Sequence, residues 1–213
     1  MLSSLTRTSL SVSIATGLYG ISYGALAVAA GLSLWQTQLL SLAMFTGGSQ
    51  FAFVAAIPGG GATAAAAASL MSVRNAIYGA QMNAELRPRG VLRPLAAHAT
   101  VDESVAVSLA QKTPADRAKG FWMTGWGVFF FWNLLTFVGA VAASRVDPSA
   151  WGLDGAAVAA FIGLLWPRLM ERKHWAIAAL AAVVATLATP MLPIGTPILA
   201  AAVVAGLLGW RWS

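Results

Sequence analysis

Long apolar runs separated by short polar loops make up almost the whole of this chain. Eight runs can be read from the sequence, at 9–30, 35–57, 62–86, 95–111, 121–143, 153–166, 175–189 and 194–210. About 20 apolar residues suffice for a helix to cross a bilayer. Seven of the runs are predicted to cross, whereas 95–111, which is short and carries charges, is predicted to re-enter or tilt. The predicted fold class is therefore all-α: a polytopic helical membrane protein with about seven transmembrane helices plus a short re-entrant or tilted segment, in a single transmembrane domain over 1–213.

The composition supports a membrane protein and excludes several other classes. Hydrophobic residues form 58% of the chain and charged residues only 9%, whereas soluble domains carry about 25% charged residues. The sequence contains no cysteine, which excludes disulfides, thiolate metal sites and cysteine nucleophiles. The net charge of +6 comes from basic residues clustered in short loops, so we expect no nucleic-acid partner.

The distribution of lysine and arginine predicts an orientation. If 95–111 enters and returns while the other runs cross, ten of the thirteen basic residues share one side: Arg87, Arg89, Arg93, Lys112, Arg117, Lys119, Arg168, Arg172, Lys173 and Arg211. Arg7 and Arg145 are then on the opposite side, and Arg74 is within the membrane. Because basic loops favour the cytoplasm, we expect the N-terminus outside and the C-terminus in the cytoplasm.

Arg74 is the most unusual residue in this pattern. It stands near the middle of the run 62–86, where an arginine costs roughly 2.5–3.5 kcal/mol on insertion scales. Tyr78, Gln81 and Glu85 follow at helical spacings and are expected on the same face. The arginine either holds helices together or lines a polar site inside the bundle. The functional interpretation is favoured because intramembrane charges usually mark such sites.

Polar residues also stand near the centres of three other runs, at Gly47-Gly48-Ser49-Gln50, at Asp102-Glu103 and at Asn133. If the runs align, these groups share one depth with Arg74 and can form a site for a zwitterion. Its carboxylate would bind Arg74 or backbone amides freed by a helix broken at the glycines, and its ammonium would lie near Asp102 or Glu103. Each piece has a structural alternative. The glycines can be a packing notch, the carboxylates can lie in a surface loop, and Asn133 can be an interhelical hydrogen bond.

The order of several short motifs resembles the AzlC family, the large subunits of bacterial branched-chain amino acid exporters. The resemblance is carried by Gly20-Ile21-Ser22-Tyr23-Gly24, by Phe45-Thr46-Gly47-Gly48-Ser49-Gln50-Phe51, by Ser72-Val73-Arg74-Asn75 with Tyr78, by Val101-Asp102-Glu103, and by Gly152-Leu153-Asp154 with Phe161. Ser72, Asn75 and Val101 stand where the family has Asn, His and Thr. These departures make the polar lining weaker, so the substrate or coupling ion can differ from that of typical members.

The resemblance implies proton-driven export of branched-chain or related neutral amino acids across a bacterial inner membrane, together with a small membrane subunit of the AzlD type. We expect that subunit to contact glycine-rich surfaces such as Gly17 to Gly24. The alternative function is a non-transporting membrane scaffold or assembly partner. An enzyme is not expected, because the zinc-binding motif His-Glu-x-x-His does not occur.

These arguments together predict the residues of the site. The predicted substrate-binding residues are Tyr23, Gly47, Gly48, Ser49, Gln50, Ser72, Arg74, Asn75, Tyr78 and Asn133, and the predicted proton-coupling residues are Asp102 and Glu103. No cofactor and no metal is expected. The predicted partners are the AzlD-type subunit, a small neutral amino acid and the lipid bilayer.

Overall fold

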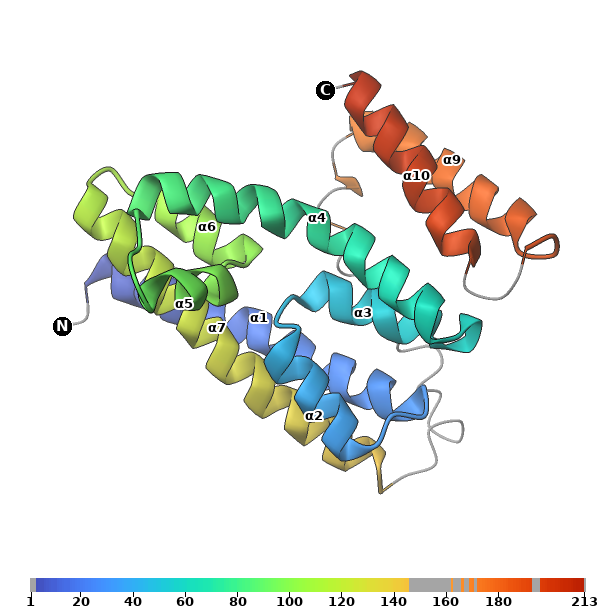
Figure 1. Ribbon diagram of the computed structural model, residues 1–213, viewed down its shortest axis with the longest axis horizontal. Coiled ribbons are helices and arrows are strands. Elements are labelled where there is room, and N and C mark those ends of the chain that lie inside the picture. The colour runs from blue at the N-terminus through green and yellow to red at the C-terminus, as the bar shows by residue number, and fades with distance from the viewer. Residues whose placement is uncertain are drawn as a thin grey trace.

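The computed structural model describes residues 3–145, 162, 166, 169–170, 172–192 and 196–212. Every regular element in these residues is helical, which confirms the all-α prediction (Figure 1). The elements are α1 (Ser4–Ala29), α2 (Leu34–Ala43), α3 (Gly47–Ala56), the 3-10 turn η1 (Ile57–Gly59), α4 (Gly61–Leu86), α5 (Leu92–Ala99), α6 (Asp102–Leu109), α7 (Pro114–Ala143), α9 (Arg172–Ala188) and α10 (Thr196–Trp212).

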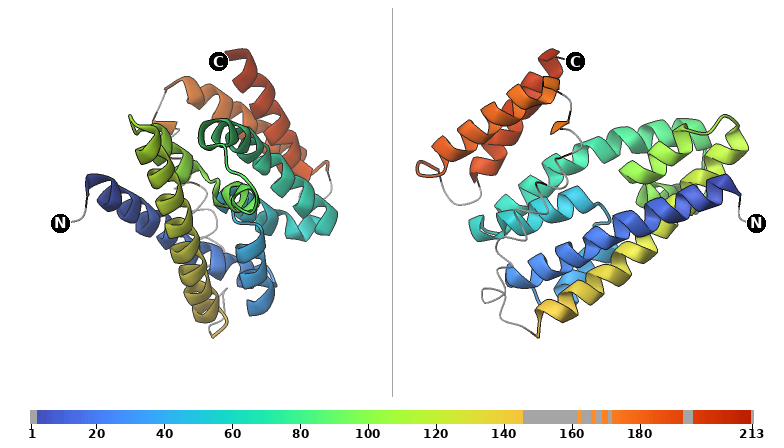
Figure 2. Two further views of the ribbon diagram at one scale, coloured as in Figure 1. Left: turned by 60° about the vertical axis from the view of Figure 1, so that its left-hand side comes forward. Right: turned by 180° about the vertical axis from the view of Figure 1, so that it is seen from behind.

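Helices α1 and α7 run side by side in the same direction and form the most extensive helix pair (Figure 2). Both are long and apolar enough to cross a membrane, on length and composition. Glycines permit their close approach: a Cβ on Gly20 would lie 2.7 Å from the carbonyl oxygen of Trp132, and a Cβ on Gly24 would collide with that of Thr136. The expectation that Gly17 to Gly24 contacts another subunit is therefore wrong, because α7 already covers this surface.

Helix α4 returns across the molecule antiparallel to α1 and α7 (Figure 1). It has 26 residues, as many as α1, and at about 1.5 Å per residue its length of roughly 39 Å exceeds the thickness of a bilayer core. Its C-terminal end meets the start of α7, where Glu85 forms an ion pair with Arg117. Glu85 thus joins α4 to α7 and does not share a polar face with Arg74, contrary to the expectation from the sequence.

Two helical hairpins fill the space between the long helices. Helices α2 and α3 enter from the end where α1 finishes and return to the end where α4 begins, with their tip at residues 44–46 (Figure 1). Helices α5 and α6 enter from the opposite end and return there, with their tip at Thr100 and Val101. The tips meet, since the rings of Phe45 and His98 have centroids 5.6 Å apart.

The segment 95–111 therefore folds back on itself as predicted, whereas the prediction that 35–57 crosses as one broken span is wrong. The prediction failed because two ten-residue helices joined by a turn have the same apolar composition as a single crossing helix. The order of hairpin followed by long helix occurs twice, as α2–α3–α4 and as α5–α6–α7, with the hairpins entering from opposite ends. Sequence reading found no such repeat.

The location of Arg7 requires a second correction. Leu5, two residues before it, lies beside Gly120 at the start of α7: a Cβ on Gly120 would be 3.4 Å from Leu5 Cδ1. The start of α1 is thus at the same end of the molecule as the basic residues around α5, α6 and the beginning of α7. The expectation that Arg7 and the N-terminus are on the side opposite these basic loops is wrong.

Helices α9 and α10 form an antiparallel pair beside α4 (Figure 1). Leu199, in the first turn of α10, packs against Ala56 and Ala64 at the end where α4 begins. Helix α10 then runs toward the end that carries the basic loops. Most of the predicted crossing 153–166, together with Gly152-Leu153-Asp154 and Phe161, lies outside the described residues. The count of seven crossings accordingly stays a prediction.

Candidate functional site

An ion pair joins the middle of α4 to the tip of the second hairpin. Arg74 Nη1 lies 2.6 Å from Asp102 Oδ2. Arg74 stands near the midpoint of α4, and Asp102 is the first residue of α6. The two side chains are 40% and 39% exposed, so a ligand could reach the pair. Guanidinium and carboxylate thus share the depth at which both hairpins end.

The first hairpin adds a helix N-terminus to the same place. A Cβ on Gly48 would lie 2.9 Å from Arg74 Nη2, so the start of α3 touches the guanidinium. Thr46 precedes α3 but makes no side-chain cap to its first-turn amides. Uncapped N–H groups carry partial positive charge and favour anions. The amides and Arg74 together form an electropositive point that suits a carboxylate.

Serine hydroxyls hold α3 against α4 beside this point. Ser49 Oγ lies 2.8 Å from Ser72 Oγ, and Thr46 Oγ1 donates to Ser49 Oγ at 2.8 Å. Ser72 also bonds back to the carbonyl oxygen of Ala68. This chain of hydroxyls crosses from the hairpin tip to α4, so it fixes the start of α3 relative to Arg74.

Helix α6 presents two carboxylates in its first turn, where the helix dipole favours negative charge. Ser104 fixes this turn, since its hydroxyl accepts from the amide of Val101 and donates to the carbonyl oxygen of Ala99. The two carboxylates have different partners. Asp102 faces Arg74, whereas Glu103 accepts a hydrogen bond from Thr16 of α1, with 3.3 Å between Thr16 Oγ1 and Glu103 Oε1.

Several buried polar atoms around the ion pair have no hydrogen-bond partner among the described residues. They include Asp102 Oδ1, Arg74 Nε and Asn75 Oδ1. Asn75 uses its other amide atom, Nδ2, to donate to the carbonyl oxygen of Thr100 at the tip of the second hairpin, at 3.4 Å. Unpaired buried polar atoms are costly, and three from adjoining residues mark a place where a polar ligand would supply the missing bonds.

A family model matches this chain over residues 11–146, described as AzlC protein. The chain belongs to the AzlC family. The match spans α1 to α7 and therefore both hairpins, the ion pair and the glycine contacts between α1 and α7. It confirms the resemblance drawn from the motifs, and membership implies a role related to membrane transport. No curated protein and no solved structure matches the chain.

Three residues predicted for the site lie elsewhere in this AzlC protein. Gln50 is fully buried but points back to α2, where its Nε2 donates to the carbonyl oxygen of Leu40. Asn133 lies between α7 and α2 and receives a hydrogen bond from Gln38. Tyr78 packs with the buried cluster around Met82 and Phe121. Gln50 and Asn133 thus bond to neighbouring helices, and Tyr78 packs into a buried cluster.

Tyr23 and Gly47 flank the site through an aromatic cluster. Tyr23 is fully buried and packs against Phe51 and Trp132, with ring centroids 5.7 and 6.0 Å away. Gly47 fits under the same indole, because a Cβ there would lie 2.8 Å from Trp132 Cη2. The cluster packs against the first turn of α3 through the contact of Trp132 with Gly47. Its members therefore help to position the AzlC site and do not line the ion pair.

Sequence reading missed Thr16 and Thr100. Thr16 contacts Glu103 although the two residues are 87 positions apart. Thr100 ends α5, and its carbonyl oxygen receives Asn75. Neither threonine belongs to a motif quoted for the AzlC resemblance. Thr100 could have been found from the two acidic residues that follow, because carboxylates gather in the first turn of a helix and so predict a helix start just after it.

Proposed function

We propose that this chain is the large subunit of a secondary transporter that exports branched-chain or related neutral amino acids across a bacterial inner membrane, driven by protons. The observation that carries the proposal is the Arg74–Asp102 ion pair at the meeting point of two hairpin tips. Discontinuous helices that enter from opposite sides and end near mid-depth are typical of secondary transporters, whose substrates bind at the breaks.

The chemistry of the site fits a zwitterion. A substrate carboxylate would bind the amides at the start of α3 and the guanidinium of Arg74, which touches Gly48. The substrate ammonium would bind Asp102, whose Oδ1 is buried and unpaired. A substrate that satisfies both ends replaces part of the internal ion pair. The free energy of binding can then loosen the contact between α4 and the second hairpin.

The carboxylates of Asp102 and Glu103 have different roles in this proposal. Asp102 already has a cation as partner, whereas Glu103 has the neutral hydroxyl of Thr16. A carboxyl group without a cationic partner can exchange a proton without breaking an ion pair. We therefore assign proton coupling to Glu103, and we assign substrate binding and closure of the pathway to Asp102 with Arg74.

Orientation and partner complete the proposal. Arg7 and the two basic loops share one end of the molecule, and α10 runs toward that end. The positive-inside rule then favours a cytoplasmic location for both termini. The partner is the small AzlD-type subunit that the family implies. Helices α1 and α7 cover each other's glycines, so that subunit would bind elsewhere on the surface.

Counterflow in proteoliposomes tests the proposed function. The chain is reconstituted with the small subunit, loaded with leucine, valine, isoleucine or methionine, and supplied with radiolabelled amino acid outside. We expect exchange with at least one of the four, and Asp102→Asn should remove it. Glu85→Gln is the matched control, because it breaks the ion pair with Arg117 at the periphery. If the four amino acids all fail to exchange, the substrate class is wrong, and if no solute moves with any partner, the scaffold alternative holds.

A further inference from the structure

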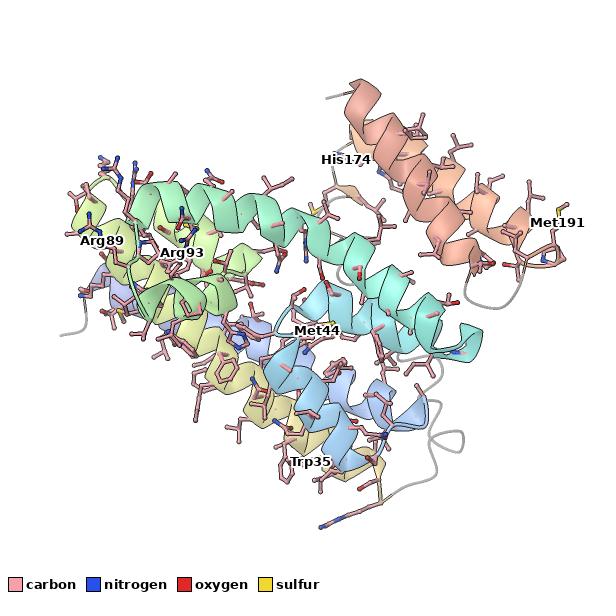
Figure 3. The ribbon with its side chains drawn as sticks, in the orientation of Figure 1. Trp35, Met44, Arg89, Arg93, His174 and Met191 are labelled. Carbon is pink, nitrogen blue, oxygen red and sulfur yellow. The ribbon has the colours of Figure 1, made fainter. Side chains whose placement is uncertain are left out.

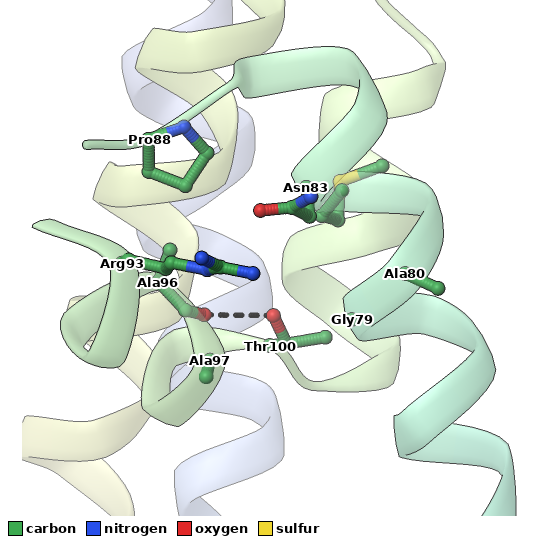
Figure 4. A pocket seen from close by; sticks show the side chains of 9 residues that line it. Gly79, Ala80, Asn83, Pro88, Arg93, Ala96, Ala97 and Thr100 are labelled. Carbon is green, nitrogen blue, oxygen red and sulfur yellow. Dashed lines mark hydrogen bonds between the residues drawn. The ribbon is translucent and has the colours of Figure 1, made fainter.

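A cavity opens between the last turns of α4 and helix α5, from Arg93 to Thr100, near the basic end of the molecule. Its volume is about 380 Å³, within the range of 300–1,000 Å³ that is usual for small-molecule sites. Small or apolar residues form most of the wall: Gly79, Ala80, Met82, Ala96 and Ala97. Asn83, Arg93 and Thr100 supply its polar side chains. The Thr100 hydroxyl already donates to the carbonyl oxygen of Ala96, and Arg93 extends across the space from α5 toward α4 (Figure 4).

No carboxylate in the described part of the chain pairs with Arg93. Among the described residues, Glu85 is engaged by Arg117 and Asp116 accepts a hydrogen bond from Thr113. No carboxylate of the described residues lies within ion-pair distance of Arg93. Arg87 and Arg89 stand in the same loop, and Arg89 and Arg93 lie together at this end (Figure 3). The mouth of the cavity is therefore strongly cationic.

The loop also carries apolar side chains that face outward. Val91 is 78% exposed and Leu92 is 50% exposed, directly before Arg93. Exposed aliphatic groups between arginines suit the boundary of a membrane, where the apolar groups enter the acyl region and the guanidinium groups stay with the phosphates. Arg87 adds a local constraint, since it ends α4 with a φ of 47°, a left-handed conformation usually taken by glycine.

We propose that the cavity between α4 and α5 binds an anionic phospholipid. Its phosphate pairs with the Arg93 guanidinium and accepts from Asn83, and the first part of one acyl chain lies along the apolar wall between the two helices. The proposal is independent of the transported substrate. The cavity lies on the flank of α4 away from Arg74, and none of the residues assigned above to substrate or proton lines it.

The structure favours a lipid over a free phosphate because the site has two parts. A free anion would need donors on several sides. Among the side chains that line this cavity, Arg93 and Asn83 offer donors, the Thr100 hydroxyl already donates to Ala96, and the remaining residues are small or apolar. A lipid satisfies both parts, since it joins one phosphate to long apolar chains. Basic pockets between helices on the cytoplasmic side are suited to such headgroups.

Native mass spectrometry of the full chain in detergent, titrated with phosphatidylglycerol or phosphatidylcholine, tests the proposal. In salt of about 0.3 M the general surface attraction is largely screened. We expect preferential binding of one phosphatidylglycerol, weakened at least about tenfold by Arg93→Gln because a charge-assisted bond is lost. Arg89→Gln is the matched control: it removes the same charge four residues earlier, in the loop before α5, but does not line the cavity, and it should bind as the native chain does.

A second pair of variants tests the cavity without changing charge. Ala80→Phe fills the space and should abolish the preference, whereas Ala84→Phe, one turn along α4 and outside the cavity, should preserve it. Equal binding by Arg93→Gln and Arg89→Gln would overturn the proposal, as would equal binding of the two lipids. Displacement of phosphatidylglycerol by glycerol phosphate or inorganic phosphate at similar concentrations would also overturn it, and would assign the site to a free anion.

Discussion

Arg74 stands in an unbroken helix, whereas its partner Asp102 is the first residue of a half-helix, and 2.6 Å separates Arg74 Nη1 from Asp102 Oδ2. The pair thus connects a long helix to the tip of a hairpin that enters from one end. Gly48, at the tip of the hairpin from the other end, touches the same guanidinium. One arginine therefore contacts both hairpins, and its position depends on both.

Removal of either charge should abolish transport. Arg74→Ala or Asp102→Asn leaves the other group near mid-depth without its partner, and loss of one member of a fully buried pair costs about 2–5 kcal/mol. Because both side chains are about 40% exposed, we expect the lower part of that range, and at least a tenfold slower exchange. Counterflow measures the rate, and size-exclusion chromatography checks that the variants stay folded. Native exchange by either variant would contradict the mechanism.

Gly48→Ala should impair transport with little loss of stability. The added Cβ would lie 2.9 Å from Arg74 Nη2, so the guanidinium must move away from the start of α3. That move is cheap because it displaces the far end of a flexible side chain, but it disturbs the electropositive point proposed for the carboxylate. Gly61→Ala is the control, also in the first turn of a helix, where a Cβ meets nothing within 4 Å. Unequal thermal stability of the two variants would point to packing instead.

Glu103→Gln should separate exchange from coupling. The amide keeps the size of the side chain and can still accept from Thr16, but it cannot gain or lose a proton as a carboxyl group does. We expect counterflow to continue while an imposed pH gradient no longer drives net movement. Asp102→Asn is the contrasting variant and should lose both activities. If Glu103→Gln still responds to the pH gradient, proton coupling does not involve this residue.

Gly24→Ala should destabilise the isolated chain. Its Cβ would collide with the carbonyl oxygen of Thr136, which belongs to backbone and cannot turn aside. Overpacking of this kind typically costs about 1–3 kcal/mol, and the effect should appear as a lower unfolding temperature without any second subunit. Gly206→Ala, where a Cβ meets nothing within 4 Å, should leave stability equal or slightly higher. A loss of stability seen only in the presence of the small subunit would indicate that this surface of α1 contacts that subunit.

The absence of cysteine makes the orientation directly measurable. Single substitutions Ser4→Cys and Arg89→Cys should react with a membrane-impermeant maleimide from the same side, because the start of α1 and the basic loop share one end. Ser144→Cys, after the end of α7, should react from the other side. Labelling of Ser4→Cys together with Ser144→Cys, and not with Arg89→Cys, would contradict the arrangement of α1.

The long helices were predictable and the first hairpin was not. Runs 9–30, 62–86 and 121–143 were predicted as single helices and correspond to α1, α4 and α7. Run 95–111 was recognised as returning because both of its flanks are basic. The break in run 35–57 was recognised from Gly47-Gly48, but its reversal was not, because no charged residue stands on either flank to reveal the direction of the chain.

The site was partly predictable for a similar reason. Arg74 and Asp102 were identified because charges are rare and costly in apolar runs. Gln50 and Asn133 were assigned with them because they stand at similar depth, but depth does not determine the direction in which a side chain points. Each bonds to a neighbouring helix instead. Thr16 was missed because hydroxyls are common in membrane helices, and its partner comes from a distant part of the chain.

The parallel contact of α1 with α7 constrains how this protein can be made. Ser13 bonds to the carbonyl oxygen of Thr124, 111 residues further along, so the glycine face of α1 has no partner while the ribosome is still translating the hairpins and α4. Until α7 emerges, the glycine face of α1 must therefore contact lipid or the insertion machinery. Contacts between the hairpins and the α1–α7 pair are then late events, which cannot form before α7 has been synthesised.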